Sequence, residues 1–154
     1  MVWEKLKNEL ILTNLDVQDA CDVFDIMGGK LVSLGYCKDS YVDALKIREV
    51  QFPTGINLGD YGVAIPHTEA HHVNDEAIAI GTLTKPVRFV EMGTDDDYVD
   101  TQLIFMLAVD EKGHIDLLQA IIDIIQDAVV VDKIIQSQSA KEIIEIIKEK
   151  EKKS

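Results

Sequence analysis

Hydrophobic residues along the chain switch repeatedly between two spacings, the alternation typical of strands and the three-to-four-residue spacing typical of helices. The strand-like segments are residues 9–12, 63–66, 77–83, 87–90 and 102–109. Residues 103–109 are apolar throughout, which predicts a central strand covered on both faces. The pattern as a whole predicts an α/β fold in which helices pack above and below a sheet.

The first predicted helix has good N-capping residue types at positions 14–16. Its apolar face runs from Val17 to Met27, and Gly28-Gly29 follows directly. The helix is therefore expected either to end or to kink at the two glycines. If it continues beyond them, Gly35 is the predicted C-cap.

A second helix is predicted to start at Asp39 or Ser40, where Ser40 and Asp43 resemble a capping box. Arg48 falls near its C-terminal end, where the helix dipole favours a cation. The run Phe52-Pro53-Thr54-Gly55 is expected to end the helix. The residues predicted to form its buried side are Val42, Leu45, Ile47 and Val50.

Three further helices are predicted in the C-terminal third of the chain. A strongly apolar one follows Gly113-His114, a weaker one lies around residues 130–135, and the last carries apolar residues between 143 and 147. From about Lys148 the residues are charged or polar with mixed signs, so this tail is expected to be solvated, fraying helix.

Length and composition indicate one globular domain over residues 1–154. Fifteen Lys and Arg against 28 Asp and Glu give a net charge of −13, which disfavours binding to nucleic acid or to an anionic membrane surface. No apolar run approaches the roughly 20 residues that span a bilayer, and a signal-peptide pattern is missing, so we expect a cytoplasmic protein without membrane insertion. Cys21 and Cys37 form no CxxC pair and are expected to be reduced thiols.

The candidate chemistry gathers around His67, which follows a buried-looking strand and Pro66. A strand end fixes the position of an imidazole, and neutral imidazole is a competent nucleophile at cellular pH. Zinc binding is an alternative, since a helical 67–72 segment would place His67 and His71 on one face, with His114 or Glu69 as a third ligand. The run is not HExxH, and Pro66 favours a loop, so we predict no metal and no cofactor.

A phosphate carrier needs a neutral nucleophilic nitrogen, partners for the phosphoryl oxygens, and an anchor for the ring tautomer. Arg48 is a permanent cation whose planar donors suit phosphate, and Thr54 offers a hydroxyl shortly after it. His114 stands at the start of a predicted helix, where backbone N–H groups favour an anion. His71 and His72 are predicted to be solvated loop residues or groups surrounding the site.

Four ordered motifs together resemble the enzyme IIA component of the sugar phosphotransferase system, in the superfamily of fructose, mannitol and nitrogen-regulatory types. They are Arg48-Glu49 with Phe52-Pro53-Thr54-Gly55-Ile56, Gly62-x-Ala64-Ile65-Pro66-His67, Lys85-Pro86-Val87, and His114-xx-Leu117-Leu118. The resemblance implies an α/β sandwich with a mixed sheet and helices on both faces. It matches His67 to the phosphorylated histidine, His114 to the second active-site histidine, Arg48 to the phosphate-facing arginine and Thr54 to a hydroxyl position that can bond phosphate.

The resemblance further implies a protein-to-protein phosphotransferase. His67 would receive phosphate from the carrier protein HPr and pass it to a IIB component, and the membrane IIC component would import the sugar. Thr68 and the stretch after it resemble galactitol-type proteins more than fructose or mannitol types. A nitrogen-regulatory relative would carry the same histidine and signal through partner binding instead.

Overall fold

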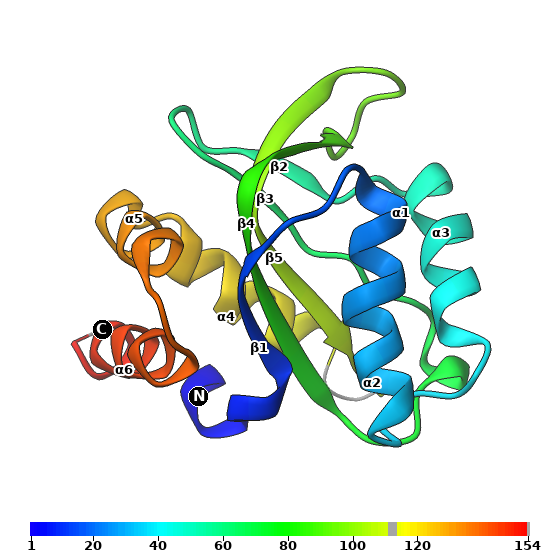
Figure 1. The fold of residues 1–154 in the computed structure, drawn as a ribbon, viewed down its shortest axis with the longest axis horizontal. Helices are drawn as coiled ribbons and strands as arrows, with labels where there is room; N and C mark the ends of the chain where they lie inside the picture. The colour runs from blue at the N-terminus through cyan, green and yellow to red at the C-terminus, as the bar shows by residue number, and fades with distance from the viewer. Residues whose placement is uncertain (111–113, 154) are drawn as a thin grey trace.

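A mixed sheet of five strands forms the centre of the protein (Figure 1). The computed structural model describes residues 1–110 and 114–153, with the side chains of residues 114 and 115 outside the description. Strand β4 is antiparallel to β5 and β2 to β3, whereas β1 runs parallel to β4 and β3 parallel to β5. This arrangement confirms the predicted fold class. In spatial order the strands are β1 (Ile11–Leu15), β4 (Ala77–Val90), β5 (Tyr98–Ala108), β3 (Gly62–Ala64) and β2 (Gly55–Asn57).

Two of the predicted strands are parts of one. Residues 77–83 and 87–90 both belong to β4, whose pairing with β5 shifts register between Thr82 and Val87. Pro86 lies inside this interval, and proline has no N–H to donate to a neighbouring strand. The short strand β2 was not predicted, because its three residues follow the helix-ending Pro53 and show too little alternation to be recognised.

Helices cover both faces of the sheet (Figure 1). On one face lie α1 (Ala20–Val23), the π-helical η3 (Phe24–Gly28), α2 (Gly29–Ser33) and α3 (Tyr41–Gln51). On the other lie α4 (His114–Ile125), α5 (Ala128–Gln136) and α6 (Ala140–Lys152). The central strand β5 serves both cores, since Phe105 belongs to one buried cluster and Met106 to the other. The prediction of a central strand covered on both faces is confirmed.

The first helix begins later than predicted and passes through its glycines. Asp19 caps it by accepting a hydrogen bond from the backbone N–H of Asp22 at 2.9 Å, so the predicted N-cap at residues 14–16 is wrong. At Gly28 a π-helical turn carries the helix onward. A Cβ atom there would lie 3.1 Å from Leu45 Cδ1, so glycine lets α3 pack closely. The C-cap is Leu34, one residue before the predicted Gly35, which follows it with a positive φ of 85° and ends the helix.

Helix α3 begins after Ser40 as predicted, but its buried side differs. Leu45 is buried, whereas Ile47 is 62% exposed and Val50 82% exposed. Each helical residue advances about 100°, so these two side chains lie roughly 200° and 140° around the helix from Leu45. Tyr41 takes the buried position one turn before Leu45. The predicted capping box is also wrong, because the Ser40 hydroxyl bonds His72 Nδ1 at 2.8 Å instead of the helix backbone.

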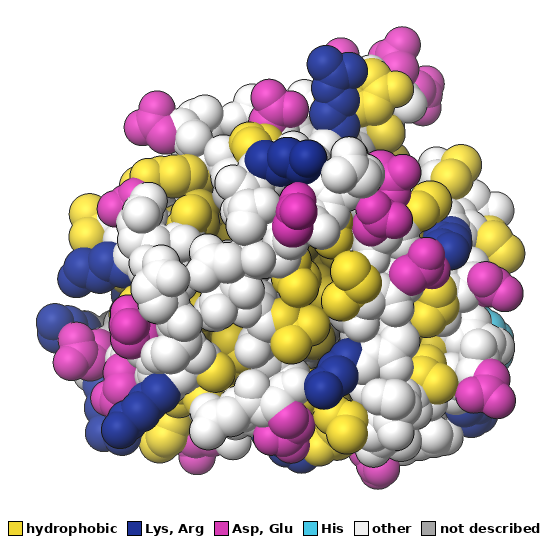
Figure 2. All heavy atoms as spheres, in the orientation of Figure 1, with side chains coloured by type: hydrophobic (Ala, Val, Ile, Leu, Met, Phe, Trp, Pro, Cys, Tyr) yellow, Lys and Arg dark blue, Asp and Glu magenta, His cyan; other side chains and the backbone are white. Residues whose placement is uncertain are grey.

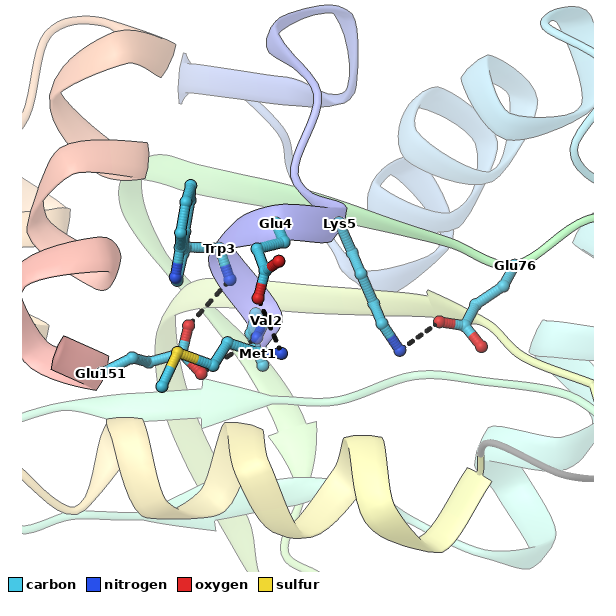
Figure 3. A network of polar contacts seen from close by, with 7 residues as sticks. All are labelled: Met1, Val2, Trp3, Glu4, Lys5, Glu76 and Glu151. Carbon is cyan, nitrogen blue, oxygen red and sulfur yellow. Dashed lines mark hydrogen bonds and ion pairs between the residues drawn. The ribbon is translucent and has the colours of Figure 1, made fainter. Parts of the chain in front are cut away.

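The charged C-terminal segment is held against the N-terminus. Helix α6 continues to Lys152, and the Glu151 carboxylate accepts hydrogen bonds from the backbone N–H groups of Val2 at 2.9 Å and Trp3 at 2.8 Å (Figure 3). The Lys148 ammonium also lies 4.8 Å from the centre of the Trp3 ring. The expected fraying from about Lys148 is therefore wrong, because the 3₁₀ turn η1 (Val2–Lys5) supplies partners for this segment.

Acidic side chains are spread over the face of the molecule shown in Figure 2, with Lys and Arg side chains among them. This acidic surface agrees with the excess of Asp and Glu over Lys and Arg in the sequence. Within the described residues, none of the helices combines the length and the apolar character needed to cross a bilayer.

Candidate functional site

His67 is held beside the central strand. After β3 ends at Ala64, the chain continues alongside β5, where the Leu107 N–H donates to the Pro66 carbonyl at 2.9 Å and His67 forms a parallel bridge with Leu107. The side chain is only 8% exposed. The structure therefore confirms the strand-end position predicted for this imidazole, and pairing with the central strand β5 fixes that position.

One ring nitrogen of His67 is already engaged by the backbone. Nδ1 lies 2.8 Å from the Ile65 carbonyl oxygen, which can only accept a hydrogen bond. Nδ1 must therefore carry the hydrogen, and in the neutral ring the lone pair resides on Nε2. The tautomer anchor expected of a nucleophilic histidine is thus present, and it makes Nε2 the ring atom that is able to act as a nucleophile.

Arg48 reaches the same neighbourhood from α3. Its Nη1 atom lies 3.1 Å from Glu69 Oε1, and its guanidinium lies 4.9 Å from the centre of the Phe52 ring. Its Nε atom is buried and has no hydrogen-bond partner among the described residues. A hollow of about 400 Å³ beside the His67 loop is lined by Arg48, Thr68, Glu69, Ala70, His71, Val109 and Asp110. An anion in this hollow would meet a guanidinium cation.

Glu69 shares this cation in the present arrangement. The pKa of its carboxyl is lowered, first by a hydrogen bond from its own backbone and then by the neighbouring Arg48. The pair is largely open to solvent on the Glu69 side, where the side chain is 50% exposed, so the contact is a weak one. Glu69 can therefore be displaced from Arg48 by a more highly charged anion.

Thr54 is buried beneath the His67 loop, and its partner is a residue that the sequence did not single out. Its hydroxyl donates to the Glu49 carboxylate at 2.9 and 3.1 Å and accepts from the Ile65 N–H at 3.3 Å. The Thr54 N–H donates to the same carboxylate at 2.7 Å. A hydrogen-bonded chain therefore runs from Glu49 through Thr54 to Ile65, whose carbonyl holds His67.

Glu49 is a half-buried residue whose carboxyl turns into this site. Burial raises its pKa from 4.5 to about 7, although the hydrogen bonds from Thr54 and the charge of Arg48 act in the opposite direction. The sequence contained one signal for it, since Glu49 directly follows Arg48 in the motif and precedes Thr54 by five residues. Nothing in the sequence indicated that the carboxylate turns inward.

His114 begins α4, but its side chain and residues 111–113 lie outside the described residues. The chain reaches this helix from β5 through Val109 and Asp110, both of which line the hollow beside Thr68. The role predicted for the His114 side chain stays a prediction.

The segment after His67 is not the helix that zinc binding through His67 and His71 would need. Only Ala70–His72 forms a 3₁₀ turn, η4, and His67 pairs with β5. The rings of His71 and His72 lie against each other with centres 4.0 Å apart and a tilt of 40° between their planes. The pKa of His72 is lowered by burial and then by His71. Over the described part of the chain, no three His, Cys, Asp or Glu side chains are grouped to hold a metal ion.

The two cysteines differ in their surroundings. Cys21 is exposed, whereas Cys37 is buried, and burial raises the pKa of its thiol to about 12. A thiol with so high a pKa is protonated at neutral pH and is a poor nucleophile.

Comparisons with known proteins define the class of this one. The family model for the phosphoenolpyruvate-dependent sugar phosphotransferase system, EIIA 2, matches residues 4–150. The galactitol-specific EIIA component of Escherichia coli (strain K12) is 28% identical over 130 residues, covering 84% of this chain and 87% of that protein. The mannitol-specific enzyme IIA component of Staphylococcus aureus (strain N315) is 29% identical over 147 residues, covering 95% and 96%.

The fold has a solved counterpart as well. The complex of enzyme IIAMtl with phosphorylated enzyme IIBMtl from Escherichia coli matches with a TM-score of 0.80 at 22% identity, over 94% of this chain and 98% of that one. The chain belongs to the EIIA 2 family of the phosphoenolpyruvate-dependent sugar phosphotransferase system. It is therefore a phosphotransferase, a phosphate carrier of that system.

Proposed function

We propose that His67 is the residue that carries the phosphoryl group, receiving it on Nε2 from the phosphorylated carrier protein HPr and passing it to a IIB component. The observation that carries this proposal is the bond between Nδ1 and the Ile65 carbonyl, because it leaves the lone pair on Nε2. The IIB component would then serve a membrane IIC component, and the protein would act in the cytoplasm without a cofactor.

The transfer balances without moving a proton. The lone pair of His67 Nε2 attacks the donor phosphorus while the bond between phosphorus and the donor imidazole breaks. The donor ring, which carries a hydrogen on its other nitrogen, keeps that electron pair and leaves as neutral imidazole. Nδ1 keeps its hydrogen, and the positive character that develops in the ring is stabilised by the Ile65 carbonyl. The same kind of displacement then passes the phosphoryl group from Nε2 to the next acceptor, so one site serves both transfers.

Arg48 is proposed to exchange Glu69 for the phosphoryl oxygens. A phosphoryl group brings roughly 1.5 to 2 negative charges and suits the guanidinium better than one exposed carboxylate does. Its buried Nε, which has no hydrogen-bond partner among the described residues, is a further donor near the site. His114 is proposed to contact the phosphorylated ring or its phosphate, supported by its place at the start of α4, where backbone N–H groups favour an anion.

Thr54 is proposed to act through the backbone. Direct bonding of its hydroxyl to phosphate was expected, but the hydroxyl hydrogen is donated to Glu49 and the oxygen accepts from Ile65. We therefore assign Thr54 and Glu49 to positioning the Ile65 peptide that holds His67.

The transported compound is proposed to be a six-carbon sugar alcohol, with galactitol as the first to test. The galactitol-specific and mannitol-specific relatives are similar to this chain to nearly the same degree, 28% and 29%, and both names denote sugar alcohols of this class. The Thr68 stretch favours the galactitol type. The sugar does not touch a carrier of this kind. The IIB component that the carrier recognises therefore determines which sugar it helps to transport.

The decisive experiment supplies phosphoenolpyruvate, enzyme I and HPr to the purified chain and then adds candidate IIB proteins. We expect one acid-labile, base-stable phosphate per chain, no label on His67→Ala, and onward transfer to a galactitol-type or mannitol-type IIB protein. Circular dichroism should show that His67→Ala remains folded. Undiminished labelling of that variant would refute the assignment. A label that no IIB protein accepts would instead indicate the nitrogen-regulatory type of function.

A further inference from the structure

The hollow beside the His67 loop has an unexpected charge for a phosphate site. Of the described residues that line it, Arg48 is a cation, whereas Glu69 and Asp110 are both acidic. The formal charge of this lining is therefore negative, although a phosphoryl group would itself bring roughly 1.5 to 2 negative charges. Tight binding of phosphate is served by cations and N–H donors. The carboxylates act against it.

Glu69 is held close to His67 by the backbone. The Glu69 carbonyl accepts a hydrogen bond from the Thr68 hydroxyl at 2.9 Å and another from the His72 N–H at 3.3 Å. Thr68 is only 2% exposed, and His67 before it pairs with Leu107 of β5. The Glu69 carboxylate therefore belongs to a fixed segment of the chain, two residues after the nucleophile.

In the unphosphorylated chain the Arg48 guanidinium already has an anion beside it. Its Nη1 atom lies 3.1 Å from Glu69 Oε1, and the ring of Phe52, centred 4.9 Å away, supports the guanidinium. The pKa of the Glu69 carboxyl lies below its usual value because its own backbone and then Arg48 stabilise the charged form. The pair is therefore ionised at neutral pH, and Glu69 occupies the cation that a phosphoryl group would need.

We propose that Glu69 sets how strongly His67 holds its phosphoryl group, by stabilising the unphosphorylated state and destabilising the phosphorylated one. The inference rests on the proposed function of His67 and Arg48. Before transfer Glu69 pairs with Arg48, and after transfer it is displaced and stays close to a second anion. An equilibrium shifts by the difference in interaction free energy between its two states, and both effects of Glu69 favour the unphosphorylated one.

A residue with this effect suits a carrier, which has to accept phosphate from one protein and release it to the next. Arg48 alone would hold the phosphoryl oxygens through charge-assisted hydrogen bonds from its planar donors. The competing carboxylate of Glu69 reduces this stabilisation, so less free energy is lost when the group moves from His67 to its acceptor.

The test measures the equilibrium constant for phosphoryl exchange between HPr and this chain, for Glu69→Gln and for wild type. Phosphorylated HPr, freed of enzyme I and phosphoenolpyruvate, is mixed with the chain at pH 8, and the equilibrium is also approached from the phosphorylated chain. Glutamine keeps the shape of glutamate and removes the charge. Docking of the two proteins changes the rates of exchange but not an equilibrium constant between the free proteins, so the measurement isolates the stability of phosphorylated His67.

Asp25→Asn is the matched control. The Asp25 carboxylate pairs with Lys46 Nζ at 2.8 Å, its side chain is 56% exposed, and it does not line the hollow. The control therefore removes one negative charge and one exposed ion pair, as Glu69→Gln does, but away from the site. Circular dichroism should show that both variants remain folded.

We expect Glu69→Gln to shift the equilibrium toward the phosphorylated chain by about threefold to tenfold, since the lost ion pair and the lost repulsion each contribute a factor of a few. Asp25→Asn should leave the constant unchanged. An unchanged constant for Glu69→Gln, or a shift toward the unphosphorylated chain, would overturn the role of Glu69 and leave the proposed function intact. An equal shift for Asp25→Asn would also overturn it, because net charge would then be the cause. A wild-type chain that takes no label from HPr would overturn the proposed function itself.

Discussion

The half-buried carboxyl of Glu49 contributes to the pH dependence of this protein's stability, and Glu49→Gln should remove that contribution. In the folded chain burial raises the pKa from 4.5 to about 7. Between these two pH values the folded state holds a proton that the unfolded state has released. Stability from this group is therefore present at low pH and is lost as the pH rises through about 7.

The magnitude follows from the two pKa values. A group that shifts from 4.5 to about 7 on folding lowers the free energy of unfolding by about 2.5 kcal/mol when the pH rises from 5 to 8. Glutamine has a similar shape and does not titrate, so the variant should lack this pH-dependent change in the free energy of unfolding. The difference in unfolding free energy between Glu49→Gln and wild type should shift by about that amount, in favour of the variant at pH 8.

Urea unfolding followed by circular dichroism at pH 5 and pH 8 measures this shift. Comparing variant with wild type at each pH cancels the contributions of all other titrating groups. Glu145→Gln, an exposed position on α6, is the control and should show no such shift. The same difference between Glu49→Gln and wild type at both pH values would refute the reasoning, since it would mean that Glu49 is not buried as described.

The same substitution should slow phosphorylation of His67. The Glu49 carboxylate accepts from both the N–H and the hydroxyl of Thr54, and a glutamine amide can accept through only one of its two terminal atoms. We expect labelling at pH 8 to slow by roughly threefold to tenfold, which corresponds to about 0.7–1.4 kcal/mol, the range of one ordinary hydrogen bond. A variant that is more stable than wild type but is labelled more slowly would indicate that the Glu49 carboxylate supports phosphorylation at a cost in stability.

Two further changes test contacts that support the site and the chain ends. Tyr41→Phe removes the bond from a fully buried hydroxyl to the Leu107 carbonyl at 2.7 Å, and should lower the free energy of unfolding by about 1–2 kcal/mol in urea titration. An unchanged midpoint would contradict that bond. Glu151→Ala removes the acceptor of the Val2 and Trp3 amides and should speed hydrogen exchange at both, whereas Glu149→Ala, exposed on the same helix, should not.

The sequence was sufficient for much of the fold and for the position of His67. Residues 103–109 could be recognised as a central strand because a strand covered on both faces is apolar at every position. His67 and Arg48 could be singled out because a strand-end imidazole and a helix-end cation are chemically distinctive. The ends of the helices and strands were predicted less accurately. The π-helical turn at Gly28 and the continuity of β4 depend on the residues that pack against them.

Only the tertiary structure decided which groups each side chain contacts. Periodicity predicted a buried side of α3 that includes Ile47 and Val50, but the packing of Tyr41 and Leu45 in the core turned both of these side chains outward. Glu49 is indistinguishable in sequence from a solvated glutamate until Thr54 and Ile65 are brought beside it. The physical reason is that local sequence encodes spacing and capping, whereas burial and charge partners come from residues that folding alone brings together, as with Glu151 and Trp3 at opposite ends of the chain.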